Sequence, residues 1–304
     1  MAKENGTDRQ LRIRHQGKRR LKLAIGLLVY LADRISMCLR LLGGRKRCSS
    51  FVVLSYHSVP PQHRALFAGQ MDTLLRYATP VGAGMDPGWS DGKHYAAVTF
   101  DDAFQSLLDN ALPELGRRRI PCTIFAVSET LGQPANWEDI GETHGNEQIM
   151  TVEQMRQVAS DRVCIGAHTL THPVLTKLDE QAARREITES RSRLQELLGQ
   201  EIPLFSFPYG AFNDRLVSLC REAGYERVYT TLPAPVGAHE FVVGRTPVDP
   251  TDSKLEFHLK LVGAYRWVSF ASSLKARTKS LIGGMKSSGR QAAIAGMIDE
   301  KRPS

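Results

Sequence analysis

Short apolar runs and longer helical stretches alternate along the sequence from Tyr95 to Thr231. Strands separated by helices in this way form parallel βαβ units, so the pattern predicts an α/β fold. A chain of 304 residues that is 42% hydrophobic is long enough to bury one large core. We expect strands at 51–56, 95–100, 122–127, 163–167, 204–207, 227–231 and 241–243, and helices at 67–77, 104–118, 152–160, 180–198 and 214–223.

Two of the expected strands end abruptly in polar residues. Asp101 and Asp102 follow the first strand, and His168 and His172 follow the second. Active sites of parallel α/β barrels lie at the carboxyl ends of the strands. Asp102, His168 and His172 are ligands that a divalent ion such as zinc accepts while keeping one position open for water. Asp101 would then be the neighbouring carboxylate that takes a proton from the attacking water.

Each pair also has a purely structural interpretation. An Asp-Asp pair after a strand often caps the next helix, which here would begin at Ala103. Two histidines four residues apart are commonly unrelated polar residues, and Pro173 argues against a helix that would place both on one face. Two adjacent carboxylates have separate roles only where the strand breaks into a loop that redirects one of them.

Three motifs, in order along the chain, carry a resemblance to a known family. TFDDA at 99–103, HTLTHP at 168–173 and FPYG at 207–210 resemble the motifs of the polysaccharide deacetylases, the NodB-like enzymes of carbohydrate esterase family 4. The resemblance implies a distorted (β/α) barrel of the NodB-homology type, a zinc-type ion for which cobalt or nickel would also suit, and hydrolysis of acetyl groups on sugars. It implies Asp101 as the base, a backbone N–H of Tyr209 as a donor to the oxyanion, and as metal ligands Asp102, His168 and His172.

The strand at 51–56 delivers His57 to the same end of the sheet. LSYHSV at 54–59 resembles the opening strand of exopolysaccharide-deacetylase members of the family, in some of which the last motif, a strand-end histidine, comes first. The resemblance therefore implies His57 as the general acid, because an imidazolium can protonate a departing amine. The alternative is a histidine that caps a loop at the barrel mouth. No strand-end histidine is obvious late in the chain, since His239 precedes a strand and His258 lies in an expected helix.

One position departs from the family pattern. The arginine often found two residues before the proline of the Pro-Tyr pair is replaced by Ser206. Another residue must therefore orient Asp101, and Arg245, which follows the strand at 241–243, is a candidate. The alternative for Arg245 is a surface salt bridge.

The net charge of +8 belongs to the two ends of the chain. Residues 1–47 hold 13 Lys and Arg against 3 Asp and Glu, residues 271–304 hold 7 against 2, and the rest has a net charge of −7. A body that binds nucleic acid would carry a basic patch of its own, so we expect no nucleic-acid partner. An anionic membrane surface is the better partner for the basic ends.

Residues 1–20 are expected to be disordered, and the apolar run from Leu21 to Leu42 is interrupted by Asp33, Arg34 and Arg40. The run is short for a membrane span, and no cleavage site for a signal peptide is clear. We interpret it as an interfacial helix or weak signal anchor, with a helix packed on the outside of the barrel as the alternative. The expected location is cytoplasmic or at the membrane periphery.

The chain is expected to divide into a basic tail with this helix at 1–47, a catalytic domain at 48–250 and a helical basic extension at 251–304, with helices at 254–262 and 265–282. Within the catalytic domain, the segment between Val127 and Thr151 is long enough to line a substrate groove. Trp137 in this segment either stacks on a sugar ring or packs inside the protein. The segment also contains Glu138, Asp139, His144 and Glu147, which are typical of a polar loop.

These features favour a metal-dependent hydrolase that removes acetyl groups from a polysaccharide or oligosaccharide, N-acetyl in preference to O-acetyl. An amidohydrolase acting on a small non-sugar amide is an alternative that a narrow pocket would favour. A catalytically silent scaffold that binds saccharide is a third interpretation, and the missing motif arginine is its main support.

Overall fold

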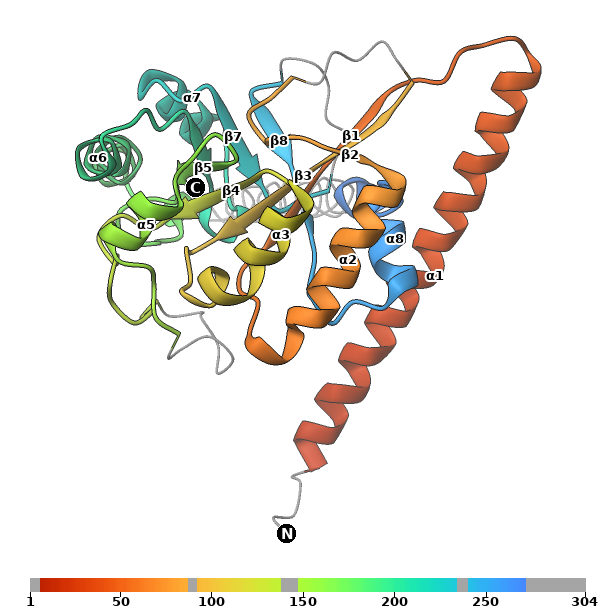
Figure 1. The fold of residues 1–304 in the computed structure, drawn as a ribbon, viewed down its shortest axis with the longest axis horizontal. Helices are drawn as coiled ribbons and strands as arrows, with labels where there is room; N and C mark the ends of the chain where they lie inside the picture. The colour runs from red at the N-terminus through yellow and green to blue at the C-terminus, as the bar shows by residue number, and fades with distance from the viewer. Residues whose placement is uncertain (1–5, 87–91, 138–146, 234–239, 272–304) are drawn as a thin grey trace, which may run out of the picture.

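The structure, a computed structural model, describes residues 6–86, 92–137, 147–233 and 240–271, and side chains from residue 17 onward. Its strands are β1 Ser50–Tyr56, β2 Thr79–Pro80, β3 His94–Asp101, β4 Cys122–Ala126, β5 Val163–Ala167, β6 Leu204–Ser206, β7 Arg227–Thr230, β8 Val242–Gly244 and β9 Thr246–Pro247. They form one parallel sheet in the order β8-β7-β6-β5-β4-β3-β1-β9, with β2 also paired to β3. The sheet curls almost closed (Figure 1), so the distorted (β/α) barrel is confirmed.

Helices cover the outside of the barrel (Figure 1). The α-helices are α1 Gly6–Leu42, α2 Arg64–Tyr77, α3 Leu112–Arg118, α5 Val152–Val158, α6 Glu180–Leu198, α7 Asp214–Glu222 and α8 Lys254–Leu261. Shorter turns are η1 Pro61–His63, η2 Leu107–Ala111, η3 Leu175–Lys177 and η4 Pro208–Gly210. α8 contacts both α1 and α2. Among the helices of the described segments, none is apolar over a long enough stretch to cross a membrane.

Two expectations about the elements are wrong, and one strand had no counterpart among them. The helix expected at 104–118 begins only at η2, which is π-helical, because the chain first makes a turn at Ala103. Residues 6–20, expected to be disordered, are the first part of α1. β9 was not expected, since a two-residue strand that includes Pro247 has no recognisable alternation.

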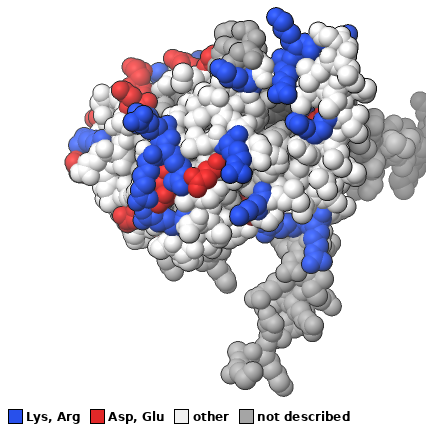
Figure 2. Space-filling model, turned by 45° about the vertical axis from the view of Figure 1, so that its right-hand side comes forward, with Lys and Arg blue, Asp and Glu red and all other residues white. Residues whose placement is uncertain are grey.

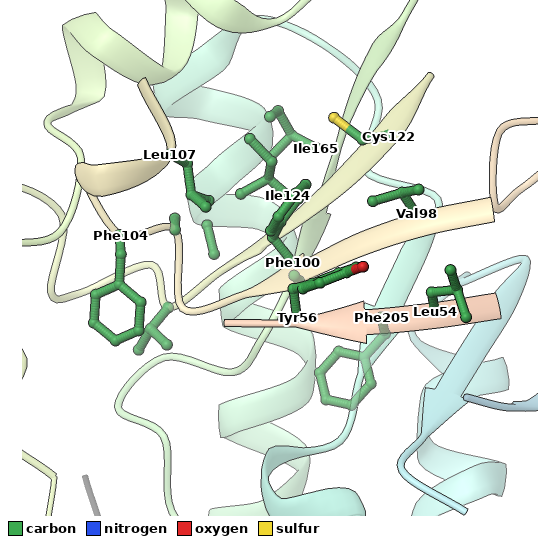
Figure 3. Packing of buried hydrophobic residues seen from close by; sticks show 14 of the residues in the cluster. Leu54, Tyr56, Val98, Phe100, Phe104, Leu107, Cys122, Ile124, Ile165 and Phe205 are labelled. Carbon is green, nitrogen blue, oxygen red and sulfur yellow. The ribbon is translucent and has the colours of Figure 1, made fainter. Parts of the chain in front are cut away.

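Alternate side chains of β1 pack in two different layers. Phe51 and Val53 belong to a cluster inside the barrel, together with residues of β3, β4, β7 and β8. Leu54 and Tyr56 point the other way, into the main core between the sheet and the helices, where they lie beside Phe100 (Figure 3). Side chains of a strand point to alternate faces, so each strand contributes to both layers.

The carboxyl end of the barrel interior is polar. Ser55, Thr99 and Asp101 continue the inward-facing positions of β1 and β3, and all three are buried. Ser55 Oγ lies 3.5 Å from Asp101 Oδ2, and Thr99 Oγ1 donates to the Leu54 carbonyl at 2.8 Å. The interior is therefore apolar at one end and hydrogen-bonded at the other.

A single residue joins the two edges of the sheet. β8 pairs with β7 at one edge, and β9 pairs with β1 at the other, through Leu54 beside Thr246. Only Arg245 separates the two strands in the chain, and its side chain is completely buried. The chain thus crosses the remaining gap in the barrel at Arg245, whose side chain enters the polar interior.

Gly166 in β5 allows the strand to pass close to its neighbours. A Cβ atom at this position would lie 2.5 Å from two carbons of the Phe125 ring and 3.0 Å from the Leu204 carbonyl oxygen. Gly166→Ala is expected to lower the free energy of unfolding by about 1 to 3 kcal/mol, because the ring and strand must move apart. Denaturant unfolding measures this loss. The control is Gly69→Ala in α2, where no atom lies within 4 Å and alanine should stabilise. Equal stability of the two variants would contradict the packing argument.

Candidate metal centre and active site

The chain breaks out of β3 between the two carboxylates. Asp101 is the last residue of the strand, whereas Asp102 and Ala103 have φ angles of 72° and 57°. This left-handed turn leaves Asp101 inside the barrel, beside Arg245, and directs Asp102 toward His168 and His172. The following helix begins after Ser106, without a side-chain cap. The interpretation of the pair as a helix cap is therefore wrong.

Backbone strain is concentrated at this end of the barrel. Six non-glycine residues of the described segments have positive φ, and one of them, Arg119, ends α3. The other five belong to the motif segments: Asp102, Ala103, Thr169, His172 and Tyr209. Such conformations cost roughly 1 to 3 kcal/mol each and persist where the surrounding structure enforces them, commonly at functional sites.

Asp102, His168 and His172 come together in one buried cluster. One ligand atom from each lies within 4.8 Å of the others. Asp102 Oδ1 is 3.8 Å from His168 Nε2 and 3.5 Å from His172 Nε2, too far for a good hydrogen bond. In the described part of the chain, this carboxylate oxygen has no hydrogen-bond partner. A buried acceptor without a donor is costly, and a cation between the three atoms would satisfy it.

Neighbouring groups fix the tautomer of His168 and the position of the His172 ring. His168 Nδ1 lies 2.7 Å from the Ser206 carbonyl oxygen, which only accepts, so Nδ1 carries the proton and Nε2 keeps its lone pair. The His172 backbone N–H donates to Thr169 Oγ1 at 3.0 Å. The His172 ring packs 4.5 Å from the Trp137 ring and 4.8 Å from the Tyr209 ring. These contacts hold two neutral nitrogen ligands ready for a metal.

Arg245 holds the second carboxylate. Its guanidinium donates to both oxygens of Asp101, each at 2.7 Å. It also donates to Ser206 Oγ at 2.7 Å and to Thr99 Oγ1 at 3.1 Å. The surface salt bridge considered for Arg245 is therefore wrong. The buried, bidentate pair fixes Asp101 in one orientation, and Ser206, at the motif position, is itself a partner of the guanidinium.

The profile of the polysaccharide deacetylase family matches residues 90–228. This segment of the chain therefore resembles the polysaccharide deacetylases. YxkH of Bacillus subtilis (strain 168), whose name places it among the polysaccharide deacetylases, is 26% identical over 170 residues, 55% of this chain and 54% of that protein. The chitooligosaccharide deacetylase of Rhizobium leguminosarum bv. trifolii is 27% identical over 136 residues, 44% of this chain and 55% of that protein. The chain thus spans about half the length of these curated relatives.

Solved structures share the fold of this chain. IcaB from Ammonifex degensii is 26% identical, with a TM-score of 0.59 over 72% of this chain and 98% of that one. The Streptococcus pyogenes deacetylase PplD, solved with acetate, is 18% identical, with a TM-score of 0.57 over 70% of this chain and 98% of that one, and shows the fold alone. The family profile excludes β1 and everything after β7, so it contains neither His57 nor Arg245.

The electrostatics of the centre separate the two carboxylates. Burial is the largest single influence and raises the pKa of Asp101. The charge and hydrogen bonds of Arg245, together with the charges of His168 and His57, outweigh it and lower that pKa below its usual range. Burial, and next the charge of Asp101, raise the pKa of Asp102 well above its usual range. Asp102 is therefore the carboxylate that needs a cation to stay ionised, since a metal charge reverses this shift. Asp101 remains an available base.

Burial also keeps both histidines of the cluster neutral. It lowers the pKa of His168 to about 4 and that of His172 to about 2. Metal ligation requires the unprotonated imidazole. Neither histidine has to lose a proton near pH 7, so the donor set fits a divalent ion.

The remaining predicted residues lie around the centre. His57 is exposed at the end of β1 and acts electrostatically on Asp101, His168 and His172. Tyr209 is 40% exposed in η4. Trp137 is 9% exposed and packs on His172, so its interpretation as a packing residue is confirmed. Three polar residues of the expected groove lie outside the described segments: Glu138, Asp139 and His144.

Proposed function

We propose that the chain is a metal-dependent hydrolase that removes acetyl groups, N-acetyl in preference to O-acetyl, from a polysaccharide or oligosaccharide. The cluster of Asp102, His168 and His172 beside the Arg245-bound Asp101 carries this proposal. The match of residues 90–228 to the polysaccharide deacetylase profile and the likeness to a protein named chitooligosaccharide deacetylase support the saccharide substrate.

Asp102, His168 and His172 would hold the divalent ion, and the bound ion would supply Lewis acidity toward the acetyl carbonyl. Zinc suits a set of two imidazoles and one carboxylate, and so do cobalt and nickel. The ring packing of Trp137 and Tyr209 on His172 keeps this ligand in place and excludes water from its sides.

Asp101 accepts the proton of the attacking water, and Arg245 keeps its carboxylate ionised and correctly turned for this step. The backbone N–H of Tyr209 donates to the oxygen of the attacked carbonyl as negative charge develops there. His57, at the open mouth, protonates the departing amine. A separate acid matters more for an amine than for an alcohol, which favours the N-acetyl substrate.

The test is acetate release from N-acetylglucosamine oligomers by the purified chain. Chelation should abolish release, and added zinc, cobalt or nickel should restore it. His57→Ala should lower release from N-acetyl substrates by roughly 10²-fold and affect O-acetylated sugars less. Release that persists after complete metal removal would contradict the proposal. Bound metal with no release from any acetylated saccharide would favour the small-amide or silent-scaffold alternatives.

A further inference from the structure

One face of α1 is fixed against the rest of the molecule. Leu23, Val29 and Tyr30 pack on a small cluster formed by Leu259, Ala264 and Tyr265. Gly26 makes the closest approach, since a Cβ there would lie 3.0 Å from the Tyr265 ring. The packed alternative for this helix is thus correct for its inner face.

Ion pairs at two levels set the rotation of α1 about its axis. Arg19 donates to Glu256 at 2.7 Å and to Asp252 at 3.1 Å. About 21 Å further along α1, at a rise of about 1.5 Å per residue, Asp33 accepts two hydrogen bonds from Arg266, at 2.5 and 2.7 Å. Because α1 is held at Arg19 and at Asp33, the same face of the helix points outward along the length between them.

That outward face is an apolar stripe. Leu21, Leu28, Ile35 and Leu39 are each more than 60% exposed, and Leu42 is 85% exposed. Together with Leu31 they fall within roughly 80° of arc on a helix of 3.6 residues per turn. The described residues offer these side chains no cover. A continuous stripe of this length on a protein surface indicates a binding face.

The stripe lies in basic surroundings. Between Lys18 and Arg47 the sequence has nine Lys and Arg and one acidic residue, Asp33. A groove of about 1310 Å³ runs beside the C-terminal half of α1, and its basic lining residues are Arg34, Arg40, Lys46, Arg47, Arg76, Lys93 and Arg266. Figure 2, turned so that the α1 side comes forward, shows blue basic side chains set around white surface on this side of the molecule.

We propose that α1 lies on an anionic lipid surface, with the stripe from Leu21 to Leu42 in the interface and the basic residues beside it on the lipid phosphates. An anionic lipid surface supplies acyl chains that can cover the apolar stripe and phosphates that can pair with the basic residues. A second copy of the chain would bring two basic surfaces together, and a nucleic acid would leave the leucines in water. The charge pattern therefore favours lipid over either alternative.

The experiment uses the full chain and vesicles of phosphatidylglycerol mixed with phosphatidylcholine, or of phosphatidylcholine alone. The chain should sediment with the anionic vesicles, and salt should weaken the binding. Leu28→Gln/Ile35→Gln/Leu39→Gln should lower the partition coefficient by at least about tenfold. The matched control replaces exposed apolar residues elsewhere, Leu66→Gln/Met85→Gln/Leu255→Gln, and should bind like the parent chain.

A second measurement does not depend on the folding of the triple variant. Cys38 is exposed on α1, and a polarity-sensitive dye on it, in a Cys48→Ser chain, should shift to the blue on anionic vesicles. Absence of both the shift and the sedimentation would overturn the proposal. A parent chain that is dimeric by light scattering and becomes monomeric in the triple variant, without vesicle binding, would assign the face to a second copy.

Discussion

Asp101→Asn is expected to lower kcat for acetate release by roughly 10²- to 10⁴-fold, the range for loss of a positioned base. The amide keeps the shape of the side chain but loses its negative charge and, with it, the ability to accept the proton. Because Asp101 is not a member of the ligand cluster, the variant should still bind one metal ion. Asp102→Asn should instead lose the metal. Metal content measured beside acetate release separates the two roles.

A fall in activity alone would not prove the role of Asp101, because Asn would leave the buried guanidinium of Arg245 without its partner. Removing one member of a buried pair costs about 3 to 5 kcal/mol. The double variant Asp101→Asn/Arg245→Met removes both charges and should recover much of the stability without recovering activity. If activity returned together with stability, Asp101 would be a structural residue.

Arg245→Met is expected to have the second largest effect. Without the guanidinium, burial dominates and raises the pKa of Asp101, so the base becomes protonated at higher pH. The acid limb of the pH profile of kcat/KM should therefore move upward, together with a loss of stability of about 3 to 5 kcal/mol. An unchanged acid limb would show that Arg245 only stabilises the barrel.

Returning the arginine to the motif position gives a sharper test of the same pair. Ser206 Oγ already contacts the guanidinium of Arg245. The double variant Ser206→Arg/Arg245→Ser therefore places an arginine on β6 and frees the space that the Arg245 side chain filled. This variant should recover activity to within about tenfold of the parent, since the bidentate contact is what orients the base. Ser206→Arg alone should be inactive and unstable, because it sets two buried guanidinium groups side by side.

Sequence reasoning located the centre because its residues stand in short local patterns. Asp101, Asp102, His168 and His172 follow apolar strands, and strand ends converge in a parallel sheet whatever the details of packing. The strand break after Asp101 could also be predicted from the sequence, because adjacent side chains on a strand point to opposite faces.

Contacts between residues far apart in the chain could be predicted from the sequence only in part. Arg245 could be named as a candidate for orienting Asp101, but its burial depends on how β8 and β9 close the barrel, 144 residues away in the chain. The place of Trp137, against His172 rather than a sugar, depends on the course of a loop that carries no periodic pattern. The start of α3 was misjudged because helix propensity does not register the left-handed turn at Ala103.

The closure of the barrel at Arg245 has a consequence for how the chain matures. Each strand from β3 to β8 pairs with a strand that precedes it closely in the chain, whereas β9 must return to β1, the first strand of the sheet. Until Arg245 leaves the ribosome, the carboxylate of Asp101 has no guanidinium beside it and the polar interior stays open. Synthesis of nearly the whole barrel therefore precedes the pairing of Asp101 with Arg245. A nascent chain that stalls earlier contains Asp102, His168 and His172 but lacks the guanidinium that orients Asp101.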